Sequence, residues 1–419
     1  PETGGMDVTQ ADFDKMLADV AVIIECANQS DAIRWDLVAS MPVVTPSGAL
    51  TFDGSFQRTQ QRPYYEAQGE RDFRGSAKDY ESNFSSVPAA SALKIDMQWK
   101  AAIEAEYAIS LQGLVRLASG LANEAAAAGS NMLRFTRSEL VGRIAGPVDD
   151  EPAIDADRCY DALSLRPRAA WDEENPAGAK KRDWYPWRFN RRLSLLQRPF
   201  LQVGGGADPV ILVYPTLLDH FVQRLLETGQ GLLPVELYST KEMRSWIGTA
   251  VNREGHAFNR RVAGRMIEIG WKARPDVKLT ELGGRQELGD VDVLAWDEKS
   301  GRVLAIECKR LQRARSIGEI GERLQEYATL ASPGGKRTPI QKHLDRITFL
   351  KAQPAGLARV TGISVWCQCS SPNEPKPWWI ISSTSAASRL IYRLTEVRGF
   401  PINCRQNLAI AVVWRTVSE

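Results

Sequence analysis

Two short apolar runs joined by a turn constrain the fold of this 419-residue chain more than any other part of its sequence. The first run, VDVLAW (291–296), alternates with a period near two, as a β-strand does. The second, VLAIECK (303–309), is another β-type run, and DEKSG (297–301) between them is a turn sequence. The sequence therefore predicts two neighbouring strands that carry a few charged residues into an otherwise apolar sheet.

Those charged residues are two acids and a lysine. Asp292 lies on the first strand, and Glu307 and Lys309 lie on the second. Because side chains alternate between the faces of a strand, Glu307 and Lys309 project to the same side and Cys308 to the other. Paired carboxylates about one strand apart suit Mg²⁺, which takes one or two carboxylates together with waters and phosphate oxygens.

This set of groups has a chemical rationale. A bound divalent ion acidifies a water molecule and neutralises charge that develops on a phosphodiester. A lysine beside it can orient or deprotonate the attacking water, or stabilise the phosphorus oxygens as a point charge. We therefore expect a site that hydrolyses phosphodiesters with Mg²⁺, for which Mn²⁺ can substitute.

The segment GDVDVLAW (289–296), the turn and AIECKR (305–310), with a helix on either side, resembles the PD-(D/E)XK nuclease superfamily. The resemblance covers about a quarter of the chain. It implies a restriction-endonuclease-like fold, a mixed sheet flanked by helices. It also implies that Asp292 and Glu307 ligate the metal, and that Lys309 completes the catalytic set.

Asp290 competes with Asp292 for the aspartate role. We prefer Asp292 because it lies inside the strand, flanked by Val291 and Val293, where a charge without a purpose would be costly.

The resemblance suggests two further residues. Many members carry a glutamate on the helix before the motif, and Glu254 is the candidate for this additional metal ligand. Asn259 occupies the position where other members often have that glutamate. On the following helix, in ERLQEY, Gln325 is a candidate catalytic residue that touches substrate or orders the lysine.

Positive charge is concentrated around the motif. Residues 301–360 hold 12 Lys and Arg against five Asp and Glu, in a chain whose net charge is +2. Such a concentration favours a polyanion-binding face, with Arg310, Arg313 and Arg315 as candidate nucleic-acid contacts and duplex DNA as the partner. The basic and aromatic segment KKRDWYPWRFNRR (180–192) either contacts nucleic acid or, as we prefer, is an interdomain segment that packs its tryptophans against the nuclease unit.

The chain divides into four parts. PETGG (1–5) is typical of a sortase-tag remnant, residues 6–175 are mainly helical, 176–250 form an intervening α/β segment, and 251–419 form the nuclease-like domain. The expected class is thus α/β, and α+β overall.

Local patterns fill in these parts. Phe13, Met16, Leu17 and Val20 fall on one face of a helix. Strands are expected near 199–203 and 209–214, a helix near 215–228, and a polar joint near 239–254.

Several classes of protein are disfavoured. The apolar run LAIAVVW (408–414) is far shorter than the roughly 18 residues that span a bilayer. Six cysteines without a CxxC pair and three histidines without HxH spacing argue against a Cys/His metal site. We expect a cytoplasmic protein without a membrane segment.

The sequence thus predicts a Mg²⁺-dependent deoxyribonuclease of a bacterial restriction or phage-defence system. The alternatives are a catalytically inactive nuclease fold that acts as a DNA-binding or assembly module, and an RNA nuclease. Since the chain lacks a P-loop, any NTP-driven step, and possible recognition functions, would come from a partner chain.

Overall fold

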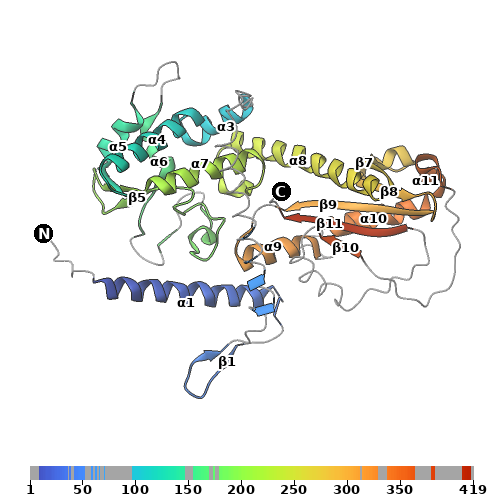
Figure 1. The fold of residues 1–419 in the computed structure, drawn as a ribbon, viewed down its shortest axis with the longest axis horizontal. Coiled ribbons are helices and arrows are strands. Elements are labelled where there is room, and N and C mark those ends of the chain that lie inside the picture. Colours follow the sequence, from blue (N-terminus) through green and yellow to red (C-terminus); the bar gives the residue numbers. More distant parts are fainter. Residues whose placement is uncertain are drawn as a thin grey trace.

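The computed structural model is elongated, with a mainly helical part at one end and a β-sheet at the other (Figure 1). It describes residues 9–35, 37–38, 42–51, 58–59, 62–63, 66, 70, 97–146, 154–168, 173–174, 179–311, 314–328, 337–363, 379–382 and 408–416. The predicted combination of a helical N-terminal region with a helix-flanked mixed sheet is confirmed. Among the described helices, none has the length and apolar character needed to cross a membrane.

The first helix, α1 (Gln10–Arg34), begins with a capping box in which Thr9 and Asp12 bond each other's backbone N–H groups. The predicted helix is present, but its apolar stripe is not part of a core: Phe13, Met16 and Leu17 are about half exposed. A two-stranded hairpin of β1 (Val43–Val44) and β2 (Leu50–Thr51) follows.

The helical part encloses a small four-stranded sheet with the order β3-β6-β5-β4. Its strands are β3 (Leu133–Thr136), β4 (Ser164–Leu165), β5 (Phe200–Val203) and β6 (Val210–Val213). Its helices are α3 (Met97–Tyr107), α4 (Leu111–Ala127), α5 (Arg137–Ile144), α6 (Ala156–Leu163) and α7 (Pro215–Gly229). The two strands predicted near 199–203 and 209–214 are present and pair as the antiparallel β5–β6 hairpin, and the helix predicted near 215–228 is present as α7.

Helix α8 (Lys241–Glu268) corrects the predicted polar joint at 239–254. Thr240 caps its first turn, and Met243, Trp246, Ile247 and Ala250 bury an apolar stripe in the helical core. These four residues stand at i, i+3, i+4 and i+7, so the helical spacing was present in the sequence and the segment was misread from its many polar residues. The second half of α8 packs on the large sheet, so one helix crosses the predicted 250/251 boundary and serves both parts.

The large sheet has the order β10-β11-β9-β8-β7. Its strands are β7 (Lys272–Lys278), β8 (Asp290–Asp297), β9 (Arg302–Leu311), β10 (Trp379–Ser382) and β11 (Leu408–Thr416). The first three are antiparallel, whereas β11 runs parallel to β9 and β10 parallel to β11. A parallel neighbour needs a long crossover, and the connection from β9 contains α9 (Ile317–Ala328), α10 (Pro339–Ala352) and α11 (Pro354–Thr361).

Different helices cover the two faces of this sheet. Phe258 and Met266 of α8 pack with Val293 of β8 on one face. Ile347 of α10 packs with Leu294, the next residue along β8, on the other. Both faces are therefore buried, which explains why the two strands are almost continuously apolar in sequence.

Gly231, between α7 and α8, offers a test of this packing. Its φ of +69° is left-handed, and an added Cβ would lie 2.9 Å from the backbone nitrogen of Val251. We expect Gly231→Ala to lower the free energy of unfolding by about 2 kcal/mol or more. In the control Gly248→Ala, the new methyl group meets nothing within 4 Å, and we expect a stabilisation of up to about 1 kcal/mol. Urea unfolding measures both, and equal stabilities for the two variants would contradict the α7–α8 packing.

Candidate active site

The β8–β9 pairing places the predicted acids side by side. Val293 pairs with Ile306, so the same register continued by one residue sets Asp292 opposite Glu307. Alternation then puts both acids on the face that α10 covers, while Cys308 lies in the core under α8. The structure thus brings Asp292, Glu307 and Lys309 together on one face of the sheet.

Glu307 is buried, with an exposed fraction of 6%, and is surrounded by basic groups. Lys309 Nζ lies 2.5 Å from its Oε1, and Arg346 Nη1 donates to its Oε2 at 2.9 Å. His343 Nδ1 lies 3.3 Å from Oε2. Burial by itself would raise the pKa of Glu307, but the nearby His343 and Lys309 outweigh it and hold that pKa at about 2.

Asp292 has the opposite electrostatic environment. Burial, and then the negative charge of Glu307, raise its pKa to about 6. Its Oδ2 accepts a hydrogen bond of 2.6 Å from the backbone N–H of Cys308. Among the described residues, no side chain forms an ion pair with Asp292. The site therefore joins a fully compensated carboxylate to one that lacks a direct cationic partner.

The competing aspartate, Asp290, lies at the start of β8 and pairs with Lys278 of β7. Its charge contributes to the raised pKa of Asp292. Asp292 is bonded to the backbone of the residue next to Glu307, whereas Asp290 is one pleat further away.

Glu254 is not brought into this group. It lies on α8, which packs on the opposite face of the sheet. In the described part of the chain, no three Asp, Glu, His or Cys side chains lie close enough to hold a metal ion together. The buried Asn259 instead donates to Asp276 Oδ1 at 2.7 Å, and His256 Nδ1 lies 2.9 Å from the same oxygen.

The remaining predicted residues have mixed outcomes. The side chains of Gln325, Arg310 and Arg313 lie outside the described residues. Arg315 is partly buried, and its guanidinium lies 4.8 Å from the ring centroid of Phe189. Arg315 thus takes part in an internal contact, and the structure does not present it as a free nucleic-acid ligand.

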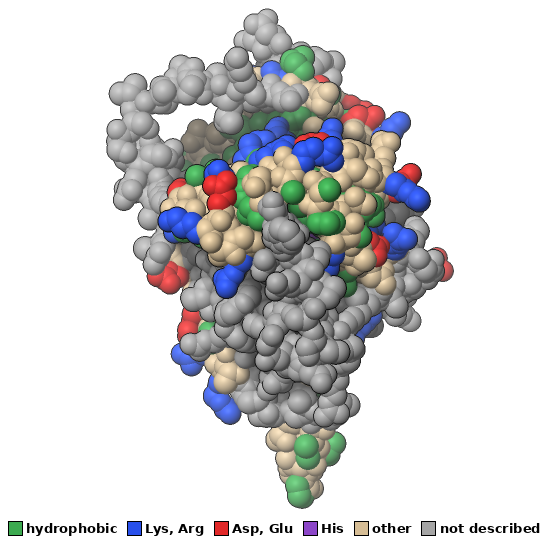
Figure 2. Space-filling view, turned by 90° about the vertical axis from the view of Figure 1, so that its right-hand side faces the viewer, with side chains coloured by type: hydrophobic (Ala, Val, Ile, Leu, Met, Phe, Trp, Pro, Cys, Tyr) green, Lys and Arg blue, Asp and Glu red, His purple; other side chains and the backbone are tan. Residues whose placement is uncertain are grey.

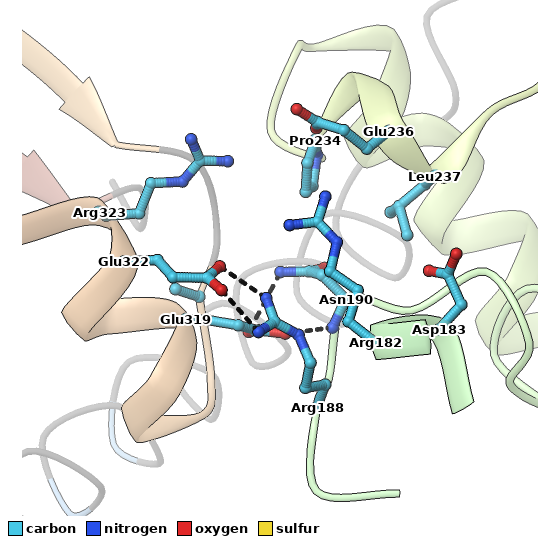
Figure 3. A pocket seen from close by; sticks show the side chains of 11 residues that line it. Arg182, Asp183, Arg188, Asn190, Pro234, Glu236, Leu237, Glu319, Glu322 and Arg323 are labelled. Carbon is cyan, nitrogen blue, oxygen red and sulfur yellow. Dashed lines mark hydrogen bonds and ion pairs between the residues drawn. The ribbon is translucent and has the colours of Figure 1, made fainter. Parts of the chain in front are cut away.

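The segment 180–192 forms the joint that we preferred in the sequence, although arginines rather than tryptophans make the contact. Arg188 donates to both carboxylate oxygens of Glu322 on α9, at 2.8 and 2.7 Å (Figure 3). The backbone N–H of Asn190 donates to Glu319 at 2.5 Å. The Phe189 ring is also contacted by Arg224, 4.7 Å from its centroid.

Part of the positive charge of residues 301–360 is neutralised by ion pairs within the protein. Arg346 contacts Glu307, and Arg337 pairs with Asp345 at 3.0 Å. Lys and Arg side chains nevertheless gather on the end of the molecule that carries α11, with a few acidic side chains among them (Figure 2).

Sequence reasoning missed His343 and Arg346, both on α10. His343 is 1% exposed and lies on the stripe of α10 that continues with Ile347 and Leu350. Arg346 follows three residues later, on a neighbouring position of the helix surface. A histidine on the buried face of a helix near a predicted acidic site was the available signal.

The donor set suits a hard divalent cation in one respect. Mg²⁺ needs only one or two carboxylates from a protein. Asp292 is a partly buried carboxylate that lies beside the second acid, Glu307, and forms no ion pair with any described side chain. Glu307 contributes if one of its cationic neighbours moves aside. The pair fits a cation that is shared with a phosphate ligand.

Comparison with known families decides the identity. The family model described as "Upx-like: Anti-phage protein Upx-like" matches residues 1–371. The chain belongs to the Upx-like family of anti-phage proteins. No curated protein and no solved structure matches it. The predicted role in phage defence is supported at the level of the family.

In this Upx-like protein, the raised pKa of Asp292 has a consequence for stability. An acid whose pKa is higher in the folded than in the unfolded state destabilises the fold once it ionises. The contribution of Asp292 to wild-type stability should therefore fall as the pH rises from about 4 to about 6. Asp292→Asn keeps an acceptor for the Cys308 N–H and removes this cost, so it should be more stable at pH 7 by about 2–3 kcal/mol and nearly equal at pH 4.

Urea unfolding at several pH values measures this difference. Asp297→Asn, at the far end of the same strand, is a control with the opposite sign. Hydrogen bonds from Ser300 and Lys299 lower the pKa of Asp297, so its replacement should lose stability at neutral pH. A pH-independent difference for Asp292→Asn would contradict the electrostatic account of the site.

Proposed function

We propose that this protein defends against phage as a Mg²⁺-dependent nuclease that hydrolyses DNA phosphodiester bonds. The observation that carries the proposal is the placement of Asp292 and Glu307 on one sheet face with the ammonium of Lys309 2.5 Å from the Glu307 carboxylate. Two acids with a lysine at one polar point of an apolar sheet are the groups that metal-assisted phosphodiester hydrolysis requires.

Asp292 and Glu307 would hold the metal. When bound, it would supply an acidified water and charge neutralisation for the phosphate. Asp292 is the more available ligand, because its described contacts include no cation within ion-pairing distance. Glu307 would exchange its contact with Lys309 for the metal and keep its contact with Arg346.

Lys309 and α10 have separate tasks in this proposal. Once released from Glu307 Oε1, the Lys309 ammonium can lie against a phosphate oxygen or the attacking water. The guanidinium of Arg346 is held by two contacts, since its Nε donates to the Leu288 carbonyl at 2.9 Å and its Nη1 to Glu307 at 2.9 Å. It therefore fixes the orientation of the Glu307 carboxylate while Lys309 moves.

One observation favours the alternative of a catalytically silent nuclease fold. Glu307 already has Lys309, Arg346 and His343 within 3.3 Å, so its charge is compensated without any metal. A fold that had lost its metal would keep such a set for stability. Cleavage and metal binding distinguish the two functions.

Cleavage is tested with plasmid, linear duplex DNA, single-stranded DNA and RNA, in Mg²⁺, Mn²⁺ or EDTA. We expect metal-dependent cleavage of DNA. Lys309→Ala and Glu307→Gln should each lower the rate by about a hundredfold or more, and the double variant should lose little more, since the groups act as a unit. Lys299→Ala, in the exposed turn of the same hairpin, should cleave at the wild-type rate. Full activity of Lys309→Ala would refute the assignment, and cleavage of RNA alone would change the substrate.

Metal binding is measured separately by thermal unfolding. A cation that binds only the folded state stabilises it by RT ln(1 + [L]/Kd), about 1.4 kcal/mol at ten times Kd. We expect Mn²⁺ to raise the melting temperature of the wild type by a few degrees and not that of Asp292→Asn. Equal shifts in both proteins would place the metal elsewhere. No shift in either, together with no cleavage of any substrate, would establish the silent fold.

A further inference from the structure

A cavity of about 200 Å³ lies beside the joint between the two parts of the protein. Its walls come from the segment 180–192, from the short 3₁₀ helix Val235–Leu237 and from the first turns of α8. The charged side chains that line it are Lys180, Arg182, Asp183, Arg192, Glu236 and Arg244. Four bases against two acids give the cavity an excess positive charge.

The two acids reduce this excess unequally. Asp183 is 5% exposed, and its carboxylate accepts the backbone N–H groups of Lys180 at 2.8 Å and of Arg192 at 3.2 Å. It therefore serves to hold the loop together, and its oxygens are already bonded to backbone donors. Glu236 is the remaining carboxylate on the wall.

Three of the bases lie within ion-pairing distance of no described carboxylate, although the charge of Arg182 does lower the pKa of Glu322. Lys180, Arg182 and Arg244 form no ion pair with any described carboxylate, and the guanidinium of Arg244 donates through Nε to the Tyr238 carbonyl at 2.9 Å. An arginine has five N–H donors, so most donors of Arg244 remain available. Like charges held together in a concave site repel one another and favour an anion between them.

We infer that this cavity binds the phosphate groups of a small oligophosphate, such as the triphosphate of a nucleotide. An arginine guanidinium can donate two parallel hydrogen bonds to two oxygens of one phosphate group. A carboxylate or a monovalent ion would accept fewer of the hydrogen bonds that these side chains can donate. The volume is below the 300–1,000 Å³ of typical whole-ligand pockets, so it suits the phosphates, with the rest of the ligand outside.

The position of the cavity links this ligand to α9. A second, smaller cavity shares Arg182, Asp183 and Glu236 with the first and reaches Glu322 and Arg323 of α9 (Figure 3). Anions bound between Arg182 and Arg244 would therefore contact segment 180–192, which also binds α9 through the ion pair of Arg188 with Glu322. Helix α9 follows β9, the strand that carries Glu307 and Lys309.

Calorimetry on the full chain in metal-free buffer tests the inference. The probes are inorganic triphosphate, ATP, dATP and a single-stranded oligonucleotide. Triphosphate should bind, and Arg182→Ala and Arg244→Ala should each weaken it about tenfold or more, because each removes a charge-assisted contact. Arg260→Ala, an exposed arginine of the same helix α8, should bind as the wild type does.

Because Arg244 also donates a hydrogen bond to the Tyr238 carbonyl, its replacement can affect the fold, and melting temperatures are recorded for all variants. Lys180 is exposed, and Lys180→Ala removes a second base of the cavity while leaving that hydrogen bond intact. No triphosphate binding at millimolar concentration, or equal binding by all variants, overturns the inference. Binding of the oligonucleotide alone, lost in Arg182→Ala, also overturns it and makes this face a nucleic-acid surface. Because no readout involves cleavage, a protein that cleaves DNA without binding triphosphate refutes only this inference.

Discussion

The buried carboxylate of Glu307 is the constraint on which the arrangement of the C-terminal half depends. An ionised carboxylate in a sheet covered on both faces is tolerated only with compensating charge and hydrogen bonds. Lys309 supplies part of this from the same strand, but His343 and Arg346 come from α10, 36 and 39 residues after Glu307 in the chain. The charge of one side chain is thus met by the same helix whose Ile347 and Leu350 pack on the sheet, so the polar and the apolar contacts of α10 hold it over the same face.

The same constraint sets the character of the neighbouring acid. The cations that keep Glu307 ionised are directed at Glu307, so Asp292 receives burial and repulsion with little compensation. Two carboxyl groups on adjacent strands thereby acquire pKa values on opposite sides of their ordinary range. Such a separation is common where carboxyl groups have different chemical tasks. It also makes Asp292 the more responsive of the two to an added cation or to pH.

Local patterns in the sequence predicted much of this structure, but they could not predict the contacts between segments that lie far apart in the chain. The β8–β9 hairpin followed from alternation, and its register placed Asp292 near Glu307. The α1 helix followed from periodicity, but periodicity does not say what covers an apolar stripe, and that of α1 is half exposed. The start of α8 was a local signal that was misread, since Met243, Trp246, Ile247 and Ala250 have the i, i+3, i+4, i+7 spacing of an amphipathic helix. The contacts of Arg346 and Arg315 depend on chain segments far apart in sequence, which no local pattern encodes.

The two parts of the molecule are held by links of different physical kinds. Helix α8 is a single element of 28 residues, about 42 Å long, whose halves are buried in two separate cores. The second link, between segment 180–192 and α9, consists of ion pairs, backbone-to-carboxylate bonds and arginine–aromatic contacts. Apolar burial along α8 has no charge for an anion to bind, whereas a polar contact beside a basic cavity responds to salt and to charged ligands. The polar link is therefore the one through which a ligand can alter how α9 is held against the helical part while the cores stay intact.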